Sequence, residues 1–176
     1  MWLPEMNNIS NAWTLLVYKI PTHPTRLRLK IWRKLQSMGA VYLQDAVCLL
    51  PSRSDLDENM EYVADSIQEM GGTSHLFTAK SVFAEGADRL IESFRQLADS
   101  RYADITERIE KVQSSIASAA SLTALESAEE ELKRERIAYL KTRRVSYFGS
   151  DREAQVEQHL DTLRRSLDGI HRGSTK

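Results

Sequence analysis

The chain has 176 residues and a formal net charge of −1, with 41% apolar and 28% charged residues. This balance is typical of folded proteins and excludes the disordered and membrane-spanning classes, and the length suits one domain or one domain with an appended helical segment. No stretch approaches the roughly 18 apolar residues of a membrane span, and the N-terminus has no basic run followed by an apolar stretch, so we expect a cytoplasmic protein without a membrane partner.

The first predicted elements are a strand and a helix. Residues 13–20 (WTLLVYKI) are apolar, rich in aromatic and β-branched side chains, and stopped by Pro21, which predicts a buried strand at the centre of a sheet. The following segment is predicted to be an amphipathic helix that opens at Pro24 and ends at Gly39. Its apolar side is formed by Leu27, Ile31, Leu35 and Met38.

The next segment predicts two short strands, a second helix and a last strand. Residues 40–50 hold two apolar runs around Gln44 and Asp45, which favours two strands joined by a tight turn or bulge. Asp55 and Glu58 form a capping-box pattern before a helix that stops at residues 71–72, both glycine. The apolar positions of this helix are Leu56, Met60, Val63, Ile67 and Met70.

With a last strand over residues 74–82, the elements form a βαββαβ order, which predicts a ferredoxin-like domain over residues 12–83. In that arrangement two helices cover one face of a four-stranded antiparallel sheet. The other face is then left to solvent or to a partner.

Residues 84–172 are predicted to form a helical hairpin or three-helix bundle, so the fold class is α+β. Apolar side chains recur at spacings of three and four in two heptad-like series, and a middle helix follows the polar break at residues 114–123. Ser150 and Glu153 form another capping-box pattern before the last helix. The bundle would pack against the sheet or against a second subunit, and we expect a homodimer. The positions are Ala98, Tyr102, Ile105, Ile109, Val112 and Ile116, then Leu125, Leu132, Tyr139 and Leu140, then Val156, Leu160, Leu163, Leu167 and Ile170.

The chain shows no recognisable catalytic chemistry. Its single cysteine, Cys48, lies in the apolar run AVCLLP and is predicted to be a packing residue in a reducing compartment. The four histidines lack metal-site spacing, and the phosphate-loop, dinucleotide, serine-hydrolase and zinc-protease motifs are absent. We therefore predict no enzyme activity, no cofactor and no metal.

Basic residues gather in two places, and each group has two interpretations. Arg and Lys can bind phosphates or another oxyanion. Alternatively, neither group binds a ligand. The cations of the first helix would then form its solvated face and pair with the acidic second helix of the same or a neighbouring molecule. Those near residue 140 would lie on an exposed helix that is supported by ion pairs. Trp32 could stack on a base or belong to the core. The candidate nucleic-acid or oxyanion-binding residues are Lys19, Arg26, Arg28, Lys30, Arg33 and Lys34 in the first group, and Lys141, Arg143 and Arg144 in the second.

Residues 13–51 resemble the N-terminal domain of ChrB, the chromate-resistance regulators of bacteria. The resemblance is carried by the motifs YKIP, PTRLR, WRKL and GAVYLQD, and by RRVSYFG at residues 143–149. The same stretch is more distantly similar to the Cas2-like domain of PaaX-type regulators and to small CRISPR-associated nucleases, which are ferredoxin-like dimers. In those nucleases an Asp follows the Tyr at the end of the first strand, whereas Lys19 stands here, so the nuclease role is not carried over.

The resemblance implies a chromate-responsive transcriptional regulator of a chromate-efflux operon, with promoter DNA and the chromate oxyanion as partners. Longer ChrB proteins have a second, C-terminal domain, so we expect a stand-alone N-terminal form. The alternative is a non-catalytic dimeric interaction module that supports another resistance protein. An enzyme of chromate reduction or nucleic-acid hydrolysis is disfavoured, because neither a cofactor motif nor a carboxylate site is present.

Overall fold

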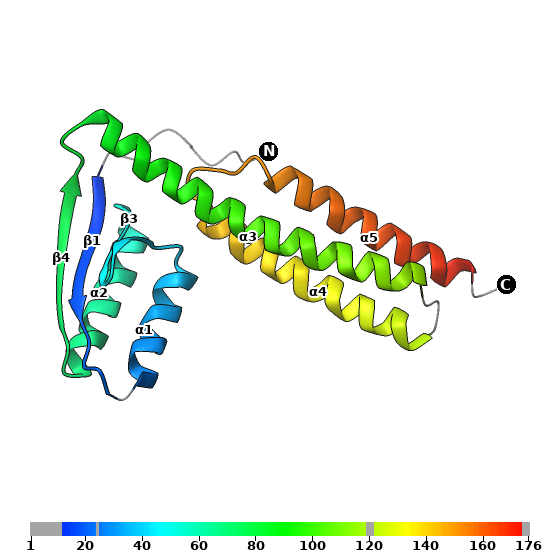
Figure 1. Cartoon of the computed structure of the whole chain (residues 1–176), viewed down its shortest axis with the longest axis horizontal. Coiled ribbons are helices and arrows are strands. Elements are labelled where there is room, and N and C mark those ends of the chain that lie inside the picture. Colours follow the sequence, from blue (N-terminus) through cyan, green and yellow to red (C-terminus); the bar gives the residue numbers. More distant parts are fainter. Residues whose placement is uncertain (1–11, 24, 119–121, 174–176) are drawn as a thin grey trace. The chain divides into compact units, whose positions relative to one another are not determined.

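A computed structural model describes residues 12–23, 25–118 and 122–173 (Figure 1). The described chain is an α+β protein, as predicted, and divides into two compact units, residues 1–94 and residues 95–176. Pro24, the N-terminal stretch before Ala12 and the centre of the predicted polar break at residues 119–121 lie outside the described residues. The elements are β1 (Ala12–Lys19), α1 (Thr25–Ser37), β2 (Val41–Gln44), β3 (Val47–Pro51), α2 (Ser54–Glu69), β4 (Thr73–Lys80), α3 (Ala84–Ser118), α4 (Leu122–Val145) and α5 (Glu153–Gly173).

The four strands form one antiparallel sheet in the order β2-β3-β1-β4, so β1 lies between two partners as predicted. Leu16 at its centre is fully buried and pairs in register with Cys48 of β3 and Leu76 of β4. Because side chains alternate along a strand, Leu16 and Tyr18 face one side of the sheet and Leu15 faces the other. A turn at Asp45 and Ala46 joins β2 to β3, which is the first of the two predicted alternatives, and the pairing of β2 with β3 also shifts in register between Tyr42 and Gln44.

Helices α1 and α2 lie on the same face of this sheet (Figure 1). Each buries the apolar stripe that its spacing predicts, with Ile31 and Leu35 from α1 and Met60 and Val63 from α2 almost fully buried. Full burial of such a side chain stabilises the fold by about 1.5–3 kcal/mol. The layer of helices is therefore held to the sheet mainly by hydrophobic contact.

The opposite face of the sheet is covered at one end by the first turns of α3. Trp13 of β1 is buried there and stacks on Phe94, with ring centroids 5.7 Å apart and planes 6° from parallel. Further along the same face, Phe77 of β4 lies opposite Leu15 and is 53% exposed. The uncovered part of this face is thus partly apolar.

The two predicted capping boxes do not describe the helix starts. The N-cap of α2 is Arg53, and the Asp55 carboxylate inside the first turn pairs with the Arg53 guanidinium, which holds the pKa of Asp55 below its usual value. At α5 the Ser150 hydroxyl accepts the Arg152 N–H at 3.1 Å instead of the Glu153 N–H. The Glu153 carboxylate pairs with Arg143, 3.2 Å away. In both cases a nearby arginine competes for the carboxylate that the pattern assigns to the backbone.

Residues 95–173 form a three-helix bundle, in which α4 and α5 pack along α3. The predicted heptad positions supply most of its core, and Tyr102, Ile109, Val156 and Leu163 are fully buried. One predicted position of the middle helix, Leu140, is instead exposed. Across the bundle, Arg108 of α3 and Glu135 of α4 form a bidentate ion pair with N–O distances of 2.7 and 2.9 Å.

Among the helices of the described residues, none is both long and apolar enough to cross a lipid bilayer.

Candidate functional site

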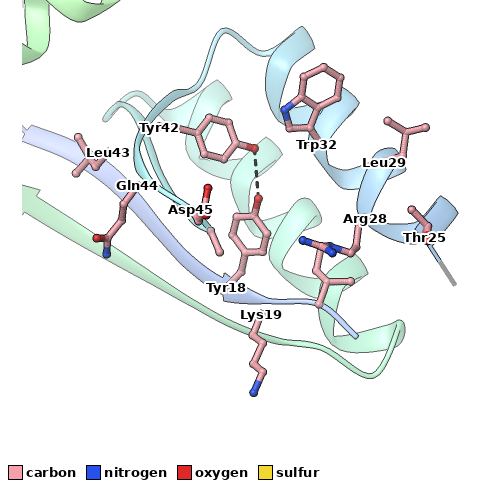
Figure 2. Close-up of a pocket in the computed structure, with 12 residues that line it drawn as sticks. Tyr18, Lys19, Thr25, Arg28, Leu29, Trp32, Tyr42, Leu43, Gln44 and Asp45 are labelled. Carbon is pink, nitrogen blue, oxygen red and sulfur yellow. Dashed lines mark hydrogen bonds between the residues drawn. The ribbon is translucent and has the colours of Figure 1, made fainter. Parts of the chain in front are cut away.

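A pocket of about 780 Å³ lies between the end of β1, the β2–β3 turn and the first half of α1 (Figure 2). We name it the Tyr18–Tyr42 pocket. The Asp45–Ala46 turn closes one side, where Ala46 adopts a left-handed backbone with φ of 60° and its carbonyl accepts the Tyr18 N–H at 3.0 Å. The ends of three elements therefore position the side chains of the pocket.

Two tyrosines from neighbouring strand ends meet in this pocket. The Tyr18 and Tyr42 hydroxyl oxygens are 3.3 Å apart, and both side chains are half-buried (Figure 2). Burial is the main cause that raises the pKa of both phenols, with the nearby Arg28 charge opposing it at Tyr18. Both phenols are therefore neutral at physiological pH. One hydroxyl donates its hydrogen bond to the other, so the pair retains one O–H group that can donate to a ligand and lone pairs that can accept.

The α1 side of the pocket combines a cation with an aromatic wall. Arg28 and Trp32 are one helical turn apart, and both line the pocket together with Leu29 (Figure 2). Trp32 is 49% exposed, which excludes the core interpretation of this residue. Asp45 supplies a carboxylate from the turn. The pocket thus holds a guanidinium, a carboxylate, two neutral phenols and an indole.

Lys19 also borders this pocket, but its ammonium group points away from the tyrosine pair (Figure 2). This follows from strand alternation, because Tyr18 faces the helices and its neighbour must face the opposite side. Lys19 and Arg28 therefore do not converge on one small anion, although both are candidates in the sequence.

Three other α1 cations, Arg26, Lys30 and Arg33, form what we call the α1 stripe. Their spacing of four and three residues places them on one side of the helix, and all three are exposed. Within the described residues none of the three forms an ion pair with an acidic side chain of the chain. Lys34, the remaining candidate, is half-buried at the flank of the helix.

The second predicted cluster, at the end of α4, does not gather into one site. Lys141 and Arg144 are exposed, whereas Arg143 is engaged by Glu153 of α5. The turn that follows is ordered by Gly149, with φ of 75°, and by Phe148, whose carbonyl accepts the Arg95 Nε–H at 3.3 Å. The RRVSYFG motif therefore also has a structural role in joining α4 to α5.

A smaller pocket of about 170 Å³ lies between α4 and α5. Three arginines line it, Arg136, Arg143 and Arg164, together with the carboxylates Glu157 and Asp161. The Arg164 guanidinium lies 3.8 Å from the Asp161 carboxylate. The pocket therefore combines two arginines of α4 with one of α5.

The sequence prediction misses the tyrosine pair, Asp45 and Arg164. The sequence does contain a signal for the tyrosines. Side chains alternate along each strand, and Tyr18 and Tyr42 fall at the alternate positions that face the helices. Arg164 belongs to the next helix, α5, and the packing of α4 against α5 places it in the same pocket as Arg136. Within the described residues no three His, Cys, Asp or Glu side chains are grouped as a metal site.

Comparison with known proteins gives two matches. Residues 28–172 match the family model described as "Protein ChrB, N-terminal". The chain is also 23% identical over 159 residues to Protein ChrB of Cupriavidus metallidurans, an alignment that covers 89% of this chain and 47% of that protein. The chain therefore spans about half the length of the curated relative that it matches.

Proposed function

Because this chain belongs to the ChrB N-terminal family, we propose that it is a chromate-resistance protein that regulates transcription by binding promoter DNA and responds to chromate. Family membership is the observation that carries this proposal. We assign the sheet unit to the ferredoxin-like arrangement, on the basis of its element order and its strand order β2-β3-β1-β4. We also treat the protein as non-catalytic.

The α1 stripe is the surface that we propose for DNA contact. Its three cations are exposed, free of intramolecular ion pairs within the described residues, and spaced along residues 26–33 on one helix face. Lys and Arg that neutralise phosphates release condensed counterions, so each contact makes affinity more sensitive to salt. A stripe of three cations therefore supplies three candidate phosphate contacts.

The test is the salt dependence of binding to a labelled fragment of the protein's own promoter. In the triple variant Arg26→Ala/Lys30→Ala/Arg33→Ala, the slope of log affinity against log salt should fall by about 2.7, from roughly 0.9 for each phosphate contact.

A matched triple variant, Lys80→Ala/Arg89→Ala/Arg165→Ala, removes the same charge from exposed positions elsewhere. If both triple variants change the slope equally, only bulk charge matters, and the α1 stripe is not the contact surface.

Chromate is proposed to bind in the pocket between α4 and α5. A tetrahedral dianion suits guanidinium donors, and three of them line this small pocket. Chromate would compete with Glu153 for Arg143 and with Asp161 for Arg164, both of which are partly exposed pairs that cost little to exchange.

Isothermal titration of the chain with chromate tests this assignment. The Arg136→Ala/Arg164→Ala variant should bind chromate at least tenfold more weakly, while the exposed pair Lys133→Ala/Arg165→Ala should not change the affinity. Equal affinities in the two variants would exclude the α4–α5 pocket as the chromate site.

A second candidate function is an interaction module that dimerises through the uncovered face of the sheet. The observation in its favour is the exposed Phe77, which lies opposite Leu15 and contacts the ring of His75 at a centroid distance of 6.4 Å. A second copy of the chain presents the same face, which makes a symmetric pair possible.

Sedimentation velocity tests this face of the sheet. The interaction module requires a dimer that dissociates in Phe77→Ser but not in the control Val82→Ser, a substitution at an exposed apolar residue of the β4–α3 loop. A monomer at every concentration, or a dimer that survives Phe77→Ser, would rule out this face.

A further inference from the structure

The Tyr18–Tyr42 pocket has a composition that DNA-backbone and chromate binding do not explain. An exposed indole offers a small tetrahedral oxyanion no charge and no planar partner. The pocket volume of about 780 Å³ lies instead in the range of pockets for organic ligands, roughly 300–1,000 Å³. A duplex backbone, in turn, is contacted by protruding cations, whereas Arg28 is set beside Trp32 at the pocket wall (Figure 2).

We propose that this pocket binds a single unpaired nucleotide, whose base stacks on Trp32 and whose phosphate lies towards Arg28. An exposed tryptophan is a general stacking platform, because every base has a π-face. The guanidinium of Arg28 presents a planar fork of donors to a phosphate. The two groups lie one helical turn apart and line the same pocket.

The remaining groups fit the polar edges of a nucleotide. The neutral Tyr18–Tyr42 pair offers one spare O–H donor without adding negative charge next to the phosphate. The Asp45 carboxylate accepts hydrogen bonds and therefore suits an amino group on a base edge. The same nucleotide chemistry occurs in a free mononucleotide and in an unpaired position of a nucleic-acid strand.

The experiment titrates the full chain with four free 5′-mononucleotides, with a five-nucleotide single strand and with a duplex of promoter sequence. The Trp32→Ala and Arg28→Ala variants should each weaken mononucleotide or single-strand binding by about tenfold or more. The control Arg89→Ala removes an exposed cation of α3 that does not line the pocket, and it should leave mononucleotide binding unchanged. Tyr62→Ala, at an exposed aromatic of α2, is the control for loss of aromatic surface.

Binding of both mononucleotides and single strands assigns the pocket to nucleotides in general, and binding of single strands alone assigns it to an unpaired position in a strand. Both outcomes support the inference if Trp32→Ala removes the binding. The inference would be overturned if the chain bound neither mononucleotides nor single strands, or if Trp32→Ala and Tyr62→Ala bound them equally well. Duplex binding through the α1 stripe is scored separately, so a failure of the pocket inference leaves the proposed function intact.

Discussion

Replacing Arg108 by Ala should lower the free energy of unfolding by about 2 kcal/mol. The side chain of its partner Glu135 is only 5% exposed, whereas that of Arg108 is 46% exposed, so the substitution leaves a buried carboxylate without its bidentate donor. Breaking a fully buried pair in this way costs about 3–5 kcal/mol. Because water can enter at the exposed arginine side, we expect a smaller cost of about 2 kcal/mol.

The assay is urea unfolding of the full chain followed by circular dichroism. The control is Lys111→Ala, which breaks an exposed pair with Glu107 on the same helix, where both side chains are more than half exposed. Because both side chains are solvated, that pair should contribute little to the free energy of unfolding. The double variant Arg108→Leu/Glu135→Leu should recover most of the stability lost in Arg108→Leu, because it leaves no buried charge.

If Arg108→Ala and Lys111→Ala shift the urea midpoint equally, the Glu135 carboxylate is not held by Arg108 and the reasoning fails. An Arg108→Leu/Glu135→Leu variant that is less stable than Arg108→Leu would also contradict it, because the pair would then stabilise the bundle beyond neutralising its own buried charge.

Three further predictions concern packing and backbone. Burial raises the pKa of the Cys48 thiol to about 12, so at pH 8 iodoacetamide should label the folded chain far more slowly than the urea-unfolded chain; equal rates would contradict burial. Gly71→Ala should lower the free energy of unfolding by about 1 kcal/mol, because φ at this position is +78°. Gly169→Ala, inside α5, should raise it by about 0.5–1 kcal/mol, so the two variants should shift the urea midpoint in opposite directions. Ile109→Ala should cost about 2–5 kcal/mol in urea unfolding, and a cost below 1 kcal/mol would exclude its place in the bundle core.

The elements and the core follow from sequence because hydrophobic periodicity dominates them. Apolar side chains are stable only in the core, and their spacing therefore reveals which face of each element is buried. This holds for the strand over residues 13–20, for Ile31 and Leu35 in α1 and for the heptads of the bundle. Helix starts are less predictable, because a cap is a weak local interaction. At Asp55 and Glu153 an arginine takes the carboxylate, and no sequence pattern separates that outcome from a capping box.

The candidate sites are only partly predictable, because charge patterns identify residue types and not their convergence. The sequence groups Lys19, Arg28 and the α1 stripe as one basic region, whereas strand and helix geometry divides them among an outer sheet face, a pocket and a solvent-facing stripe. The α4–α5 pocket is lined by Arg136 and Arg164 from two different helices, and their spacing along the chain does not show that they face each other. Such pairings require the tertiary packing of the bundle.

The most direct test of the proposed regulator is the fluorescence anisotropy of a labelled fragment of its own promoter, titrated with the chain at two salt concentrations, with and without chromate. The account predicts tight binding that weakens as salt rises and weakens again when chromate is added. Absence of binding at low salt, with and without chromate, would contradict it and would leave the dimeric interaction module as the better description.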